Sequence, residues 1–131
     1  MNMTIQSSAD AFQILKSNFN PDTEEVWGLF LDSNLNLLGA KLLHRGTANF
    51  CQIHCRDLFR ESIRLNSVFV IVAHNHPSLN VDPSIDDIKL TKKLYKIGKF
   101  LEIPIVDHII FSNLNYYSFK DSHLVFSKIR N

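Results

Sequence analysis

The sequence predicts an α/β domain with a mixed sheet, because helical patterns alternate along the chain with short apolar runs. Residues 26–31 and 68–73 are continuously apolar and bounded by polar residues, as expected of strands buried on both faces. Between them, residues 54–65 place apolar side chains at helical spacing and opposite charges three and four positions apart. Two buried strands separated by an amphipathic helix indicate a sheet packed against helices.

The other elements follow from turn and end signals. Asn, Pro and Asp in residues 18–22 indicate a loop, and Asp32-Ser-Asn34 indicates the turn of a hairpin. Gly98 and Pro104 bracket the end of the last predicted helix. The remaining predicted elements are helices over residues 10–16 and 84–100 and strands over residues 36–44, 105–111 and 116–119. The order is helix, strand, strand, helix, strand, helix, strand, strand, and we expect residues 1–131 to form a single domain.

Composition bounds the class of protein. The chain has 131 residues, of which 45% are hydrophobic and 21% charged, as is typical of a globular domain. A formal net charge of +1 gives no overall attraction to nucleic acid. The N-terminus shows no signal peptide, no apolar run reaches the roughly 18 residues of a membrane span, and two cysteines are too few for a disulfide framework. We therefore expect a cytoplasmic protein with no membrane partner.

The residues that could bind a metal or take part in catalysis are concentrated directly after the second buried strand. His74 and His76 are two positions apart, so in extended backbone their side chains share one face and can approach the same metal ion. Imidazole suits zinc, and Asp87, in the first turn of the following helix, is the natural third ligand. Three protein ligands leave a position for water, whose pKa zinc lowers to about 7. The pattern therefore predicts a catalytic zinc site.

Hydrolysis at such a site also needs groups that are not ligands. A carboxylate beside the water can take its proton and pass it to a leaving amine, and Glu24 or Glu25 at the start of the first buried strand is available for this. Ser84 can stabilise a tetrahedral oxyanion by donating a hydrogen bond. Simpler interpretations exist, because Ser84 and Asp87 also fit a helix N-cap and first turn, and both glutamates fit a solvated strand start. A bare His-x-His pair is itself weak support for a metal.

The spacing of these residues resembles a known family. His74-x-His76, seven residues, Ser84, two residues and Asp87 is identified as the JAMM (MPN-plus) metalloprotease signature. The similarity to the RadC-type branch of that family rests on the strings at residues 74–78, 83–87 and 101–110, and it runs from about residue 24 to residue 119. Four spaced residues embedded in matching strings make the resemblance highly specific.

The resemblance implies an α/β/α sandwich related to the zinc deaminases, with zinc as the cofactor. It implies that the three predicted ligands bind the zinc and that Ser84 supplies the hydroxyl beside the oxyanion. The upstream glutamate of the family falls eight residues before the aspartate that closes the first strand. That aspartate is Asp32 here, which favours Glu24 over Glu25 as the general base.

The sequence departs from the RadC-type pattern at three points. Leu79 stands where glycine is usual, and residues 54–57, His-Cys-Arg-Asp, stand where His-Pro-Arg-Glu is usual. The N-terminal helix-hairpin-helix region of full-length relatives is expected to be absent, because the chain leaves no room for it. We expect the first change to alter the loop on the metal side, and the last to remove the segment most readily tied to DNA.

Two other groups of residues have both a functional and a structural interpretation. Cys51, His54 and Cys55 suggest a second metal site, but they fit a helix N-terminus with small buried thiols better. Asp107 and His108, on a late strand, either orient a ligand of the metal or form a structural pair. Neither group is included in the predicted site.

Two functions remain open. The leading prediction is a JAMM-type zinc hydrolase that cleaves peptide or isopeptide bonds of a peptide or protein substrate. The alternative is a non-proteolytic, RadC-like accessory module in DNA repair or mobile-element biology, supported by five lysines between residues 89 and 99. These lysines also fit a solvated helix face, so a nucleic-acid partner has less support. A zinc deaminase is disfavoured because the chain contains neither His-x-Glu nor Pro-Cys-x-x-Cys.

Overall fold

The computed structural model describes residues 3–46 and 53–125. Its elements are α1 (Ser8–Lys16), β1 (Glu24–Leu31), β2 (Leu37–Gly46), α2 (Cys55–Arg64), β3 (Phe69–Asn75), α3 (Ile85–Leu101), β4 (Ile105–Phe111) and β5 (Tyr116–Ser118). This is the order predicted from the sequence, and the mixed α/β class is confirmed. None of the helices in these ranges is long and apolar enough to cross a membrane.

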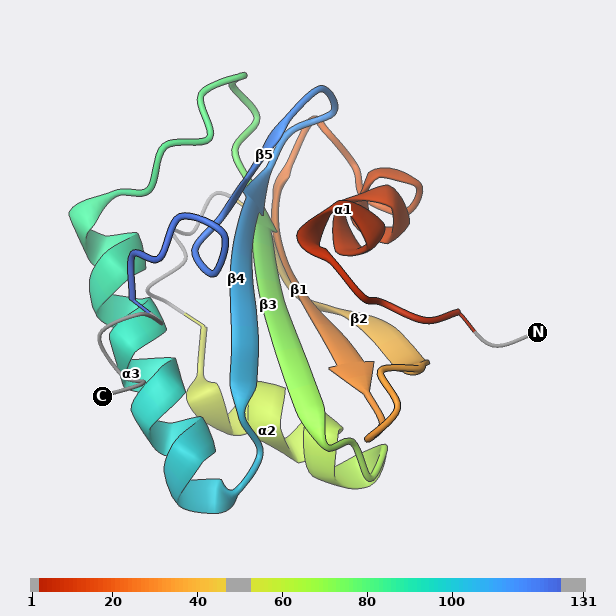
Figure 1. The fold of residues 1–131 in the computed structure, drawn as a ribbon. Coiled ribbons are helices and arrows are strands. Elements are labelled where there is room, and N and C mark those ends of the chain that lie inside the picture. Colours follow the sequence, from red (N-terminus) through yellow and green to blue (C-terminus); the bar gives the residue numbers. More distant parts are fainter. Residues whose placement is uncertain (1–2, 47–52, 126–131) are drawn as a thin grey trace.

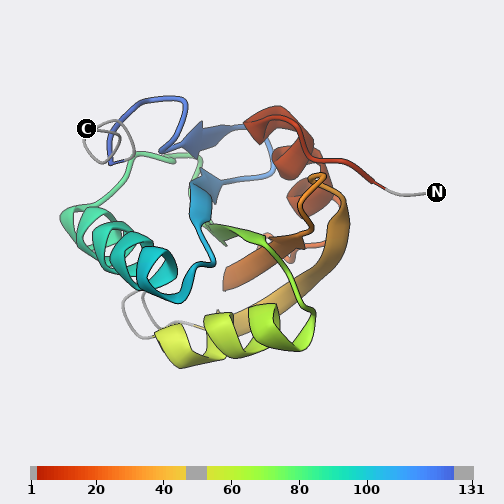
Figure 2. The same cartoon turned by 60° about the horizontal axis from the view of Figure 1, so that its bottom comes forward.

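One five-stranded sheet in the order β2-β1-β3-β4-β5 forms the middle of the molecule. β3 and β4 are parallel and are joined by α3, whereas the other neighbouring strands are antiparallel. Figures 1 and 2 show α1 on one side of the sheet and α2 with α3 on the other. The described part of the chain is thus an α/β/α sandwich, as the resemblance to the JAMM fold implied.

The core consists of two apolar layers, because the central strands bury side chains on both faces. Leu29 and Ile71 pack in the layer beneath α1. Val72 packs in the layer on the other face, together with Leu58 of α2 and Leu94 of α3. Nearly every side chain of β1 and β3 is buried, which explains the continuous apolar runs at residues 26–31 and 69–73 within these strands.

The C-terminal end of α3 packs closely against the segment that leads into β4. A Cβ atom at Gly98 would lie 2.6 Å from the carbonyl oxygen of Ile103, so no larger residue fits without a shift of the backbone. Glu102 ends the helix in the left-handed conformation, with φ at 60°. This tight exit directs the chain from α3 into β4, beside β3.

Candidate metal centre

Three predicted site residues from two elements meet at one end of the sheet. His74 lies near the C-terminal end of β3, His76 follows that strand directly, and Asp87 lies in the first turn of α3. In Figure 1 this is the upper end of the molecule, where a loop leads from β3 to the start of α3. Because α3 begins beside the end of β3, the histidine pair and the acidic first turn of the helix converge.

The potential ligand atoms form a compact group. The Nε2 atoms of His74 and His76 are 3.0 Å apart. Asp87 Oδ1 lies 3.4 Å from His74 Nε2, and Asp87 Oδ2 lies 3.9 Å from His76 Nε2. His74 and Asp87 are buried, whereas His76 is partly exposed, so the group is accessible from the His76 side. One ligand atom from each residue lies within 4.8 Å of the others, a spacing that can hold a metal ion.

The donor set fits zinc in both distance and protonation. Zinc bonds of about 2.0–2.1 Å in a tetrahedron separate neighbouring ligand atoms by about 3.3 Å, and the separations above fall on either side of this value. His76 Nδ1 lies 2.8 Å from the carbonyl oxygen of Asn80, which can only accept, so Nδ1 carries the proton and Nε2 presents a lone pair. Burial, with a smaller effect from His76, lowers the pKa of His74 to about 3. His74 therefore meets the requirement of a neutral ligand.

Glu24, at the start of β1, lies on the same face of the sheet as His74. β1 and β3 are antiparallel with Val26 opposite His74, and Glu24 is two positions before Val26. Side chains two apart on a strand share a face, which puts Glu24 on the same side of the sheet as His74. Burial raises the pKa of Glu24, while His76 lowers it and Asp87 raises it. A carboxylate with a raised pKa beside the ligands is suited to proton transfer.

Glu25, the other candidate base, is engaged elsewhere. Its buried carboxylate accepts hydrogen bonds from Arg45 Nε at 2.7 Å, Trp27 Nε1 at 2.9 Å and the backbone N–H of Asn20 at 3.1 Å. Its own backbone N–H donates to Asn75 Oδ1 at 2.7 Å. Glu25 therefore anchors the start of β1 against β2 and β3 instead of facing the histidines.

A hollow of 320 Å³ lies beside Glu24. It is lined by Asp22, Thr23, Glu24, Gly46 and Pro77. These residues come from the start of β1, the end of β2 and the loop after β3, so three segments frame one opening. Its lining includes Glu24 and Pro77, the residue that directly follows His76.

The sequence model of the RadC-like JAB domain matches residues 5–124, which include every residue of the group described above. The chain belongs to the RadC-like JAB domain family. This RadC-like chain is 47% identical over 94 residues to a UPF0758 protein of Cyanothece, covering 72% of the chain and 39% of that relative. Membership confirms the resemblance drawn from the spacing of the histidines, serine and aspartate.

Two further relatives match a larger share of the RadC-like chain. A UPF0758 protein of Thermotoga maritima is 38% identical over 117 residues, covering 89% of the chain and 53% of the relative. A UPF0758 protein of Chlorobaculum tepidum is 34% identical over 126 residues, covering 95% of the chain and 57% of the relative. The chain thus spans about half the length of the relatives it matches, and their names state no activity.

Ser84 of the RadC-like chain caps α3 and orients Asp87. The Ser84 hydroxyl oxygen accepts the backbone N–H of Asp87 at 3.0 Å, and the Ser84 backbone N–H donates to Asp87 Oδ2 at 2.9 Å. This reciprocal capping box is the structural interpretation considered for the two residues. It also fixes the carboxylate that faces the histidines. The action of Ser84 on an oxyanion stays a prediction.

His108 of β4 reaches the candidate metal centre, a contact that the sequence left undecided. Its Nε2 atom lies 3.0 Å from His74 Nδ1. The pairing of β4 with β3 skips Val106, so Ile105 and Asp107 pair with consecutive residues of β3. This bulge changes which face each later residue of β4 occupies and turns His108 toward α3. No feature of the sequence marks the bulge, so the position of His108 could not be predicted.

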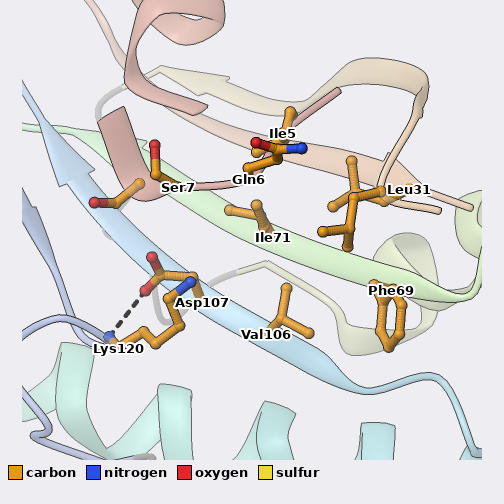
Figure 3. Close-up of a pocket in the computed structure, with 11 residues that line it drawn as sticks. Ile5, Gln6, Ser7, Leu31, Phe69, Ile71, Val106, Asp107 and Lys120 are labelled. Atoms are coloured by element: carbon orange, nitrogen blue, oxygen red, sulfur yellow. Dashed lines mark hydrogen bonds between the residues drawn. The ribbon is translucent and has the colours of Figure 1, made fainter. Parts of the chain in front are cut away.

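Asp107 faces the opposite side of the sheet from His108. Figure 3 shows it in the wall of a 260 Å³ hollow, near apolar side chains of β1 and β3. Ser118 Oγ at 2.7 Å and the backbone N–H of Lys120 at 3.0 Å donate to its carboxylate. Burial raises the pKa of Asp107 to about 6, and these hydrogen bonds offset the effect only in part. Asp107 therefore ties β4 to the segment after β5, so the predicted pair divides between two faces.

The other proposed metal group finds no support in the described ranges. Cys51 lies outside the described residues, and Cys55 is a free thiol at the start of α2. Within residues 3–46 and 53–125, His74, His76 and Asp87 form the only group of three or more potential ligands that can hold a metal ion.

Proposed function

We propose that this RadC-like chain is a zinc-dependent hydrolase that cleaves peptide or isopeptide amide bonds in peptide or protein substrates. The observation that carries the proposal is the position of Glu24. It is a partly buried carboxylate outside the ligand group, it lies beside that group, and it lines an open hollow. A purely structural zinc site is closed by its ligands and needs neither a neighbouring base nor an opening to solvent.

In the proposed reaction each residue has one task. His74, His76 and Asp87 would hold zinc, which when bound supplies a Lewis acid that polarises the substrate carbonyl and lowers the pKa of water. Glu24 accepts a proton from the attacking water and returns it to the leaving nitrogen, and its raised pKa favours this return. The Ser84 hydroxyl already accepts a backbone N–H, so its own proton remains available to donate toward the oxyanion.

The test separates zinc binding from turnover. The purified chain is loaded with zinc and incubated with a proteome-derived peptide mixture, and new termini are identified by mass spectrometry. We expect zinc-dependent cleavage in the wild type and a loss of at least about 100-fold with Glu24→Gln, the size of effect that general bases contribute. Zinc content, measured by elemental analysis, stays at the wild-type value in that variant. Glu102→Gln, the same substitution at the exposed residue directly after α3, serves as the control.

Two results count against the proposal. Equal cleavage by wild type and Glu24→Gln shows that another group is the base. No zinc-dependent new termini in any mixture, including one with isopeptide-linked lysine side chains, shows that the chain does not hydrolyse amide bonds.

A second candidate function, DNA binding without proteolysis, is favoured by the exposure of one face of α3. The five lysines on this face are all exposed: Lys89, Lys92, Lys93, Lys96 and Lys99. Phosphate contacts make affinity fall steeply with salt. The test is fluorescence anisotropy of a labelled duplex at low and high salt. Binding that weakens with salt and disappears in the variant Lys92→Glu/Lys96→Glu supports this function, and no binding at low salt removes it.

A further inference from the structure

A chain of hydrogen bonds links the two elements that carry the metal ligands. It begins at His74 Nδ1 on β3, which lies 3.0 Å from His108 Nε2 on β4. His108 Nδ1 lies 2.5 Å from Thr91 Oγ1 on α3, and Thr91 Oγ1 donates to the carbonyl oxygen of Asp87 at 2.7 Å. The chain therefore starts at one predicted ligand and ends at the backbone of another. His108 and Thr91, which lie between them, are fully buried.

The direction of each hydrogen bond follows from its last acceptor. A carbonyl oxygen only accepts, so the Thr91 hydroxyl proton points at Asp87 and Thr91 Oγ1 must accept from the other side. His108 Nδ1 therefore carries a proton and donates it to Thr91. A neutral imidazole has a single N–H, so His108 Nε2 is an acceptor and His74 Nδ1 is the donor to it.

This ordering leaves His74 Nε2 with a lone pair, directed to His76 and Asp87. With the opposite tautomer, a proton on His74 Nε2 would occupy the position where a cation has to bind. The ability of His74 Nε2 to bind a metal thus depends on the Thr91 hydroxyl, to which His74 is linked through His108. Partners of this kind fix the orientation and tautomer of metal-binding histidines.

The His108 ring is held in place from a second direction. Its plane stacks on the ring of Phe119, with centroids 4.6 Å apart and an angle of 8° between the planes. The bulge at Val106 gives His108 this face of the sheet. A fixed ring between β3 and α3 keeps the donor and acceptor positions unchanged, because buried side chains in a packed core rarely change rotamer.

We propose that His108 and Thr91 are positioning residues that set the tautomer of His74, so that metal affinity depends on two side chains that touch no metal. This inference rests on the proposed metal binding by His74, His76 and Asp87. It does not depend on whether the chain cleaves a substrate.

The first test uses paired variants at Thr91. Thr91→Val removes the hydroxyl but keeps the shape of the side chain, whereas Thr91→Ser keeps both hydrogen bonds. We expect the affinity for zinc, measured by competition with a chromophoric chelator, to fall about 10–100-fold in Thr91→Val and to stay near the wild-type value in Thr91→Ser. Equal zinc affinity in folded Thr91→Val and wild type overturns the proposal.

Variants of His108 keep the proposal testable if Thr91→Val does not fold. The amide oxygen of His108→Gln still accepts from His74 Nδ1, whereas His108→Leu offers no acceptor. We expect zinc affinity to be lost in the leucine variant and largely retained in the glutamine variant. Loss of the same size in both variants shows that the imidazole has a different task and contradicts the inference.

The second test reads the tautomers in the zinc-free protein, so it succeeds or fails independently of zinc binding. Long-range ¹H–¹⁵N NMR spectra distinguish the protonated from the unprotonated nitrogen of each imidazole. We expect His74 and His108 to carry their proton on Nδ1 in the wild type, and His74 to lose this preference in Thr91→Val. A proton on His108 Nε2 in the wild type overturns the proposal. If the tautomers are as expected and the wild type binds no zinc, the proposed function fails and the tautomer assignment stands.

Discussion

Lowering the pH from 7 to 5 is expected to destabilise the zinc-free protein through its buried histidines. Burial lowers the pKa of His74 from 6.5 to about 3. Burial, together with His74, also lowers the pKa of His108 well below 6.5. Both rings therefore stay neutral in the folded chain at pH 5, while the unfolded chain binds a proton at each. Because the unfolded state gains more protons as the pH falls, the free energy of unfolding decreases below pH 6.5.

The size of the effect follows from the two pKa values of His74. An unfolded pKa of 6.5 and a folded pKa of about 3 reduce the free energy of unfolding by about 2 kcal/mol between pH 7 and pH 5. His108 adds a loss of the same sign. Asp107 acts in the opposite direction, because its folded pKa of about 6 lies above the ordinary 3.8. The folded chain therefore takes up a proton at Asp107 between pH 7 and pH 5, which raises the free energy of unfolding by about 1 kcal/mol. The net result is a loss of stability at pH 5.

The assay is urea denaturation in the presence of a chelator at pH 7, 6 and 5, compared between wild type and His108→Gln. The variant lacks one titrating group, so it should lose less stability than the wild type over this range. An unfolding free energy that is unchanged or higher at pH 5 in the wild type contradicts the predicted destabilisation by the buried histidines. Equal pH dependences in the two proteins refute the part assigned to His108.

The remaining predictions concern the two ends of α3. Ser84→Ala should lower the free energy of unfolding by about 1 kcal/mol, because Asp87 loses the acceptor of its backbone N–H, and Ser84→Thr should restore most of it in the same urea assay. A stability equal to wild type in Ser84→Ala contradicts the capping role. Gly98→Ala should cost about 2 kcal/mol despite the better helix propensity of alanine, because its Cβ meets the Ile103 carbonyl. The exposed Lys96→Ala is the control, and a more stable Gly98→Ala protein contradicts the close packing.

The element order and the convergence of His74, His76 and Asp87 were predictable because both depend on short-range patterns. The two apolar runs are long and uninterrupted, so β1 and β3 stand out without any knowledge of their partners. His74 and His76 follow a buried strand, and Asp87 follows a serine that begins a helix. Both features can be recognised in the sequence because an apolar run and a helix cap consist of neighbouring residues.

The contacts between distant strands were not predictable from the residues alone. The choice of Glu24 over Glu25 as the predicted base rested on family spacing, because local patterns do not reveal that Arg45 and Trp27 hold the Glu25 carboxylate. The position of His108 depends on a bulge at Val106 that has no counterpart in local periodicity. One skipped residue reverses the faces of all residues after it, so a sequence read with strict alternation assigns such positions wrongly.

The most direct test of the account is anomalous diffraction at the zinc absorption edge from crystals grown with zinc. We predict one strong peak about 2.0–2.2 Å from His74 Nε2, His76 Nε2 and a carboxylate oxygen of Asp87, with Glu24 close by and not bound to the metal. A peak at any other group of residues, or no peak at saturating zinc, contradicts it.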